Sequence, residues 1–470
     1  MSAPFRPYEP DQPLVLPPDL REWLPSDHLV YFILDVTRIL DLKEIQAYYD
    51  FAPIRNDQGE VIGQRAKTSR GRPAYDPRMM TPLLLYAYVT GTPSSRQIEK
   101  KCQEDVGFRV LSGDQQPDHA TIAEFRQVHL KALAKLFVQV LELCQKTGLV
   151  KLGHVALDGT KVKANASKHK AMSYGRMVKR EAELAREIDE LMKKAEEADR
   201  EEDAKYGKGR RGDDLPEELA RRESRLAKIQ EAKAALEAEA KAEAERIRKE
   251  QAEDQERRER EGEPAKSGRK AEPSEMPKEK AQRNFTDPES RIMKNSDKAF
   301  IQGYNAQAAV DHQHQVIVAC EVTNQAADAP HLQEMVKRIE ENTGDLPKQL
   351  SADAGYFSDE NVKGLQEKRI GALIAAEKLK HGEKPPAARG RIPQHLSLKQ
   401  RMIRNLRTVA GRAAYALRKV TVEPVFGQIR TRGLLRFWLR GVEKVKSEWA
   451  LWCMGHNLLK LFRSGAFLPA

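Results

Sequence analysis

The spacing of apolar residues predicts a helical N-terminal part. Between positions 24 and 148, apolar residues recur every three or four positions, as on the buried face of a helix. Helix-start signals support this prediction. Asp76 precedes a proline that suits the first helical position, and capping-box spacing begins at Ser94 and at Thr121. Residues 1–150 are therefore predicted to form a mostly helical domain.

A second pattern, of short apolar runs bounded by turn residues, predicts strands alternating with helices. The predicted order is a strand at 151–158, strands at 302–310 and 316–323, a helix at 328–341, a strand at 350–353, a helix at 359–368, a strand at 370–376, and helices up to about 463. This order predicts one α/β domain made of residues 151–163 and 284–465.

A charged segment, residues 164–283, separates the first predicted strand from the others. From 174 to 261 it is dominated by Ala, Glu, Lys and Arg, with two apolar stripes at helical spacing. A turn-like stretch rich in Gly and Asp lies between the stripes. We predict an antiparallel, coiled-coil-like helical hairpin here, with a disordered end at about 259–280.

Charge and composition narrow the possible partners. The chain has 470 residues and carries 81 Lys and Arg against 70 Asp and Glu, a net charge of +11. This balance favours a polyanionic partner. Its four cysteines form no CxxC pair, which argues against a disulfide scaffold or a zinc ribbon. Without an apolar run of ~18 residues or a signal-like N-terminus, a cytoplasmic protein with no membrane partner is expected.

Three acidic residues are candidates for catalysis. Asp158 and Asp353 each follow an apolar run and end a predicted strand, at the edge where α/β sheets collect catalytic groups. Glu423 lies among apolar residues and, if buried, needs a partner or a metal. Three converging carboxylates repel one another unless cations neutralise them, and Mg²⁺ suits such a site. The alternative is that the aspartates cap turns and that Glu423 pairs with Arg418 or Arg430.

Several local sequences resemble the DDE-type transposases of bacterial insertion sequences, in the group with an N-terminal helical transposase domain. The resemblance covers nearly the whole chain. Its marks, in order, are GRPAYDP, LLLYAYVTG, SSRQIEKKC, PDHATIAEFRQVH, DGTKVKANAS, TDPESRIMK, QGYNAQAAVD, ADAGYFS and VEPVFGQIR. One of these is weak evidence, but all of them in the expected order are highly specific.

The resemblance implies an RNase H-like catalytic domain, interrupted here by the helical insertion and preceded by an all-α domain. Asp158 on the first strand, Asp353 after the fourth and Glu423 on a later helix would be the catalytic residues. They would hold two Mg²⁺ ions, which Mn²⁺ can replace. The implied activity is binding of terminal inverted repeats, hydrolysis of a phosphodiester at the transposon end, and strand transfer. The implied partner is double-stranded DNA, bound by a homodimer in the nucleoid.

The resemblance also implies a signature around the glutamate, made here of Tyr415, Arg418, Glu423 and Arg430. The spacing from the arginine to the glutamate is one residue longer than usual. Arg430 stands where the signature has a lysine, which keeps the positive charge. These departures leave the role of Glu423 intact and weaken the assignment of roles to Tyr415 and Arg418.

Basic residues near the candidate acids and in the N-terminal domain are expected to contact DNA phosphates, because the substrate backbone must lie near the carboxylates. They are Arg72, Arg96, Lys161, Lys163, Arg418, Arg430, Arg432 and Arg436. For Arg72, a simple turn is favoured over a minor-groove contact. For Phe437 and Trp438, core packing is favoured over contact with DNA. The helices near Ser94 and Thr121 are predicted to form a helix-turn-helix-like reader of DNA ends.

Other functions stay open at this point. An RNase H-like nuclease that cuts without strand transfer would not need an end-specific N-terminal reader. A domesticated, catalytically silent DNA-binding protein would not need three intact acids. A coiled-coil scaffold would leave most of the chain unexplained. The helical insertion is equally well explained as a dimerisation arm or as a solvated hairpin without a partner.

Overall fold

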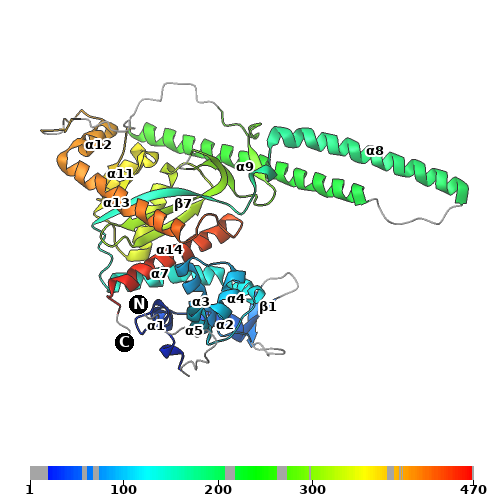
Figure 1. Ribbon diagram of the computed structural model, residues 1–470. Coiled ribbons are helices and arrows are strands. Elements are labelled where there is room, and N and C mark those ends of the chain that lie inside the picture. The colour runs from blue at the N-terminus through cyan, green and yellow to red at the C-terminus, as the bar shows by residue number, and fades with distance from the viewer. Residues whose placement is uncertain are drawn as a thin grey trace, which may run out of the picture.

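The computed structural model describes residues 19–55, 61–66, 74–206, 217–261, 272–295, 298–377, 386–390, 393 and 395–467 (Figure 1). Within these residues it is a mixed α/β protein with fourteen α-helices and one central mixed sheet. None of the described helices combines the length and the apolar character needed to cross a membrane.

The N-terminal part is mostly helical, as predicted. Its helices are α1 (Leu29–Ile39), α2 (Lys43–Asp50), α3 (Pro77–Thr90), α4 (Ser95–Glu104), α5 (Val106–Ser112), α6 (His119–Val128) and α7 (Leu130–Lys146). Asp76 caps α3 by accepting a hydrogen bond from the Arg78 amide, and Pro77 is its first residue. The predicted cap at Thr121 is wrong, because α6 begins two residues earlier with Asp118 as its N-cap.

The sequence patterns missed a small antiparallel hairpin in this part, formed by β1 (Phe51–Arg55) and β2 (Val61–Ala66). The second strand lies in a polar, basic stretch whose composition gives little strand signal. Arg72 lies outside the described residues.

The central sheet has the strand order β10–β9–β3–β7–β6, with β8 also paired to β7. The strands are β3 (His154–Lys163), β6 (Arg291–Lys294), β7 (Phe300–Asp311), β8 (Ile317–Thr323), β9 (Gln349–Ala352) and β10 (Gly371–Ile374). β3 runs antiparallel to β7 and parallel to β9, which is parallel to β10. The four strands predicted at 302–310, 316–323, 350–353 and 370–376 are confirmed as β7, β8, β9 and β10. The short strand β6 was not predicted.

Helices cover the sheet and join it to the N-terminal part. They are α10 (Leu332–Thr343), α11 (Asp359–Glu367), α12 (Leu398–Arg407), α13 (Val409–Thr431) and α14 (Val442–Ser464). α14 lies between the sheet and the N-terminal helices, and packs against β8, α7 and α3 (Figure 1). Its buried Trp452 meets the Tyr88 ring of α3 edge-on, with ring centroids 5.4 Å apart. The two parts therefore share a hydrophobic core.

Two long helices follow β3 along the chain, α8 (Tyr174–Tyr206) and α9 (Glu217–Glu261). They form an arm that projects from the sheet (Figure 1). Leu184 of α8 packs with Ile229 and Leu236 of α9 in a small separate core. At the base of the arm, η2 (Lys168–Lys170), β4 (Ala171–Ser173) and β5 (Gln282–Asn284) complete the segment.

The helices of the arm agree with the predicted apolar stripes, whereas the coiled coil stays a prediction. The turn between the helices, residues 207–216, lies outside the described residues. The predicted disordered end, 259–280, falls partly there too, at 262–271. From 272 onward the chain is described, and it leads into β5.

Candidate active site

Strand register brings the two candidate aspartates together. In the parallel pair of β3 and β9, Leu157 lies opposite Ala352, so the next residues, Asp158 and Asp353, emerge side by side. The third candidate acid, Glu423, lies on α13, which packs against β3. The prediction that Asp158 ends its strand is wrong, because β3 continues to Lys163, but Asp158 lies at the level where the neighbouring β9 ends and Asp353 follows.

Asp158 is largely buried, with a side chain 18% exposed. One carboxylate oxygen accepts a hydrogen bond from the Gly159 amide at 2.8 Å, and the other pairs with Arg418 Nη1 at 2.9 Å. Burial raises the pKa of Asp158 to about 6, and the charge of Asp353 pushes in the same direction, while Arg418 opposes the rise. The site therefore disfavours an additional negative charge and favours a cation.

Asp353 has a structural role as well. Its carboxylate accepts a hydrogen bond from the Gly355 amide at 2.8 Å, as the cap of the short helix η4 (Ala354–Tyr356). The alternative of a turn cap is therefore observed, and it is compatible with ligand binding because a carboxylate has further lone pairs. The cap fixes the direction of the Asp353 side chain.

Glu423 is not buried, although its neighbours Val422, Val425 and Phe426 are. Its side chain is 52% exposed, so the expectation of a buried glutamate is wrong. The helical period of α13 explains the difference, because adjacent residues face different directions. The predicted partner is present, since Arg418 Nη2 lies 3.4 Å from Glu423 Oε1.

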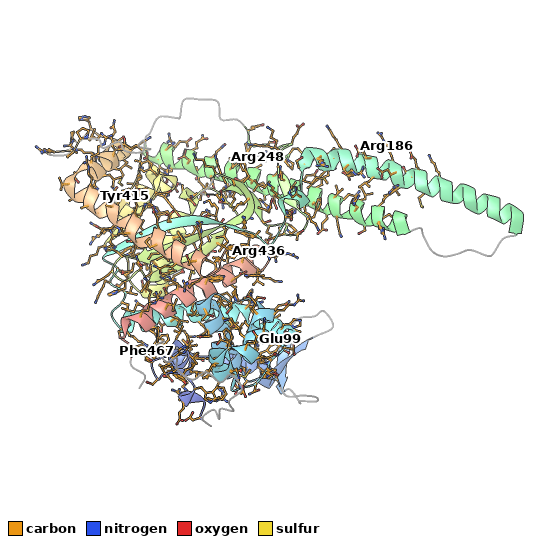
Figure 2. All side chains as sticks on the ribbon, in the orientation of Figure 1. Glu99, Arg186, Arg248, Tyr415, Arg436 and Phe467 are labelled. Atoms are coloured by element: carbon orange, nitrogen blue, oxygen red, sulfur yellow. The ribbon has the colours of Figure 1, made fainter. Side chains whose placement is uncertain are left out.

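Arg418 is the cation at the centre of this group. Its side chain is 11% exposed and forms ion pairs with both Asp158 and Glu423. Burial opposes its charge, but the nearby carboxylates, Asp158 foremost, raise its pKa overall. Tyr415 lies one turn earlier on α13 (Figure 2). Its ring centroid is 5.9 Å from the guanidinium carbon of Arg418. The signature residues on this helix are thus brought together with β3.

A fourth acid, Asp328, was not predicted. Its Oδ1 accepts hydrogen bonds from Lys161 Nζ at 2.9 Å, Asn305 Nδ2 at 2.7 Å and Gln307 Nε2 at 2.9 Å. A Cβ added at Gly355 would lie 3.0 Å from Asp353 Oδ1 and 3.2 Å from Asp328 Oδ2, so these two carboxylates converge on the glycine. The negative charge of Asp328 also contributes to the raised pKa of Asp158.

The sequence pattern around Asp328 predicts only the start of a helix. The signal that could have revealed it lies in β7, where Asn305 and Gln307 interrupt a buried apolar strand. Residues two apart in a strand face the same side, and buried amides need hydrogen-bond partners. This pattern indicates a polar cluster on one face of β7.

Three of the predicted DNA-contacting cations border the acids in exposed positions. Arg430 donates to the Thr160 hydroxyl on β3. The backbone of Lys163, at the end of β3, forms an isolated β-bridge with that of Arg436. The Arg436 guanidinium carbon lies 5.1 Å from the centroid of the exposed Trp438 ring (Figure 2). Together they form a basic rim on one side of the site.

Other predicted cations are placed differently. Lys161 is turned inward to Asp328, with a side chain 14% exposed. Arg432 points toward α14, where it donates to the Gly455 carbonyl at 3.3 Å, and burial lowers its pKa to about 10. Arg96 is exposed on α4. Of the aromatic pair, Phe437 is buried as favoured, whereas Trp438 is partly exposed.

In the part of the chain that the structure describes, no three acidic, histidine or cysteine side chains are grouped to hold a metal ion. The acids are separated by cationic side chains instead, Arg418 between Asp158 and Glu423, and Lys161 at Asp328. Hard carboxylate oxygens are nevertheless the donor type that Mg²⁺ prefers. The donor chemistry fits a hard cation once Arg418 moves aside.

Two known families match the chain. A transposase domain of the DUF772 family matches residues 18–128, and a transposase DDE domain matches residues 268–458. The first covers the N-terminal helices, and the second covers Asp328, Asp353 and Glu423 but not Asp158. No curated protein and no solved structure matches the chain.

Fold, site and matches define a DDE-domain protein with a transposase domain at its N-terminus. The two matches together confirm the resemblance to an insertion-sequence transposase of two domains that was seen in the motifs. Members of this family generally use divalent metal ions and DNA, and the DDE match implies an RNase H-like fold.

Proposed function

We propose that this transposase binds the terminal inverted repeats of its element, hydrolyses a phosphodiester at each end, and transfers the strand to target DNA. The observation that carries this proposal is the placement of Asp158 on β3 beside Asp353, which directly follows the adjacent parallel strand β9, with Glu423 joined to Asp158 through Arg418. The strand order of the sheet, with two strands parallel to β3 and β7 antiparallel, supports an RNase H-like catalytic domain.

Asp158, Asp353 and Glu423 would hold Mg²⁺, with Mn²⁺ as a substitute. When bound, two such ions stabilise the attacking and leaving oxygens of an in-line displacement. The protein groups prepare the site. The Gly159 and Gly355 amides orient the two aspartates, and Arg418 pairs with Asp158 and Glu423, from which it would withdraw for these acids to hold a divalent ion. Released from the acids, the Arg418 guanidinium would be available to a DNA phosphate.

The exposed cations Lys163, Arg430 and Arg436 would hold the DNA backbone beside the acids. Arg432 is left out of this surface, because its guanidinium donates into α14. Lys161 would act from within, by holding Asp328. Phosphate contacts of this kind fix the register of the duplex without reading its sequence.

Sequence recognition would come from the N-terminal domain, residues 1–150. α4 packs on α5 and α6 and exposes Arg96, which supports a helix-turn-helix-like arrangement. The catalytic domain would comprise residues 151–163 and 284–465, and the insertion residues 164–283. A homodimer would bring two DNA ends together.

The test is an excision and cleavage assay on DNA that carries the flanks of the element. Purified wild-type protein with Mg²⁺ is expected to produce cut ends and joined products, and Asp158→Asn none. Asp359→Asn on α11 is the matched control and should keep full activity. Cut ends without joined products would favour a nuclease, and specific binding without cutting would favour a silent DNA-binding protein.

A further inference from the structure

A basic groove lies at the base of the arm, between α8, α9 and η2. It has a volume of about 980 Å³. Six of its lining residues are Lys or Arg, namely Lys170, Arg176, Arg180, Arg221, Arg225 and Lys228. Among the described residues that line it, none is Asp or Glu. The arm is otherwise rich in glutamate, so the groove is a local separation of charge.

The helical period explains how the cations gather. Arg221, Arg225 and Lys228 are spaced at i, i+4 and i+7 and therefore share one face of α9. Arg176 and Arg180 are one turn apart on α8. Both basic faces turn toward the same groove, because the small apolar core of the arm fixes the rotation of the two helices.

The acids of the arm lie elsewhere. Glu181 pairs with Lys233 at 2.9 Å, and Glu237 accepts a hydrogen bond from the Tyr174 hydroxyl at 2.7 Å. Farther along α9, Arg246 pairs with Glu243 and Glu250. Of the cations that line the groove, Arg180 pairs with Glu183 at 2.8 Å and with Glu187 at 3.1 Å, and Arg221 also has an interaction partner. The other lining cations, Lys170, Arg176, Arg225 and Lys228, still give the groove an excess of positive charge, which favours a bound anion.

The size and lining of the groove indicate a chain of phosphates and not a single small anion. Exposed Arg225 and Lys228 lie on α9, Arg176 on α8 and Lys170 on η2, so the cations come from three elements around a groove of about 980 Å³. Half-buried Phe285 and buried Ile229 supply apolar lining between them. A repeating anionic backbone with apolar sugar edges complements such a surface.

The path of the chain connects the groove to the active site. β3 carries Asp158 and continues through Lys163 to η2, whose Lys170 lines the groove. Twelve residues separate Asp158 from Lys170, so the two lie at most ~40 Å apart. At 3.4 Å per base pair, a duplex cut at Asp158 reaches the groove within about 12 base pairs.

We propose that this groove binds the phosphate backbone of the duplex being cleaved, about one helical turn away from the scissile bond. The choice of DNA rests on the proposed function, whereas the preference for a polyanion rests on the groove itself. The arm would then serve as a second, sequence-independent DNA contact that holds the duplex in line with the acids.

The test compares two double variants with equal loss of charge on α9. Arg225→Gln with Lys228→Gln alters the groove, and Arg246→Gln with Lys249→Gln alters exposed, ion-paired cations outside it. Binding of full-length protein is measured by mobility shift across a salt series. One duplex extends about 30 base pairs on each side of the cleavage position, and another is trimmed to about 6. Circular dichroism checks that both variants fold.

The groove variant is expected to bind the long duplex about tenfold more weakly, with a salt slope lower by roughly 2, as for two lost phosphate contacts. It should bind the trimmed duplex as wild type does, and the control should match wild type on both. An unchanged salt slope on the long duplex, or an equal loss in the control, would overturn the proposal. If the wild-type protein shows this binding pattern but never cleaves DNA, the proposed reaction is refuted, whereas the proposal for the groove is supported.

Discussion

The active site and the groove of the arm are both charged, but they handle charge in opposite ways. At the active site three of the four acids pair with a cation from the same chain, since Arg418 pairs with Asp158 and Glu423, and Lys161 with Asp328. In the groove, cations line the surface without acids among the described lining residues. The first region is neutralised by its own cations, whereas the lining of the second keeps an excess of positive charge that favours a partner from outside.

This difference separates two kinds of ligand binding. A site whose acids are already paired must exchange its internal cation for metal ions, so binding there involves a rearrangement of Arg418. A groove with convergent cations needs no exchange and gains directly from phosphates. Substitutions in the active site should therefore affect chemistry and stability together, and those in the groove should affect DNA affinity without stability.

The largest effect is expected for the acids themselves. Asp158→Asn, Asp353→Asn and Glu423→Gln should each reduce DNA cleavage by at least ~10³-fold, because a neutral amide is a poor substitute for a carboxylate toward a hard divalent ion. Single-turnover cleavage with Mg²⁺ measures this, with DNA binding as the check on folding. Cleavage within tenfold of wild type in any one variant would remove that residue from the set.

The placement of these acids shows how far the sequence could lead. Asp158 and Asp353 could be predicted because each ends a strong apolar run, and the parallel pairing of β3 with β9 then brings them together. The exposed position of Glu423 could not be predicted, because the apolar residues beside it in the sequence do not give the rotation of α13 about its axis. Asp328 was missed because its importance depends on the amides of β7, which become its neighbours only in the folded sheet.

The arm teaches the same lesson with the opposite outcome. Its helices follow from apolar stripes that lie within continuous segments, so local periodicity sufficed. Its groove does not follow from local periodicity, because the basic stripes of α8 and α9 face each other only once the two helices pack. Local elements were predictable, and surfaces assembled from distant segments were not.

The next effect should be on stability when the internal cation is removed. Arg418→Gln leaves Asp158 buried without its partner, which should lower the free energy of unfolding of the metal-free protein by about 3 kcal/mol. Mg²⁺ should restore part of this loss. Urea unfolding with and without Mg²⁺ measures both.

Arg407→Gln serves as the control for this variant, because its pair with Glu377 is about one-third exposed. It should cost no more than about 0.5 kcal/mol, with no response to Mg²⁺. Equal losses in the two variants would show that Arg418 has no special role in neutralising the site.

A smaller effect is expected for Glu448, whose carboxylate binds the backbone that follows Arg436 of the basic rim. This fully buried residue accepts hydrogen bonds from the Trp438 and Leu439 amides. Burial raises its pKa from 4.5 to about 7. The folded state thus binds a proton more tightly than the unfolded state, and stability falls as pH rises from about 4.5 to 7. The full shift corresponds to roughly 3 kcal/mol, which Glu448→Gln should abolish.

Unfolding free energies at pH 5 and pH 7.5 measure this pH dependence in wild type and variant. Glu443→Gln, on the exposed first turn of α14, is the control and should keep the pH dependence of wild type. A variant at Glu448 whose stability still falls with pH as wild type does would show that this carboxyl group is already ionised at pH 5.

The smallest effect is expected for Trp438, and it distinguishes DNA binding at the basic rim of the active site from DNA binding in the groove. Arg436 lies over the exposed ring of Trp438, and a cation–π contact of this kind contributes about 0.5–1 kcal/mol. Trp438→Leu should therefore weaken binding of even the trimmed duplex by about two- to fivefold, since Arg436 loses the surface that orients it toward DNA. The groove variant should leave that short duplex unaffected. If Trp438→Leu instead weakened only the long duplex, the rim and the groove would form one continuous surface, and the division between an internally neutralised site and an open groove would fail.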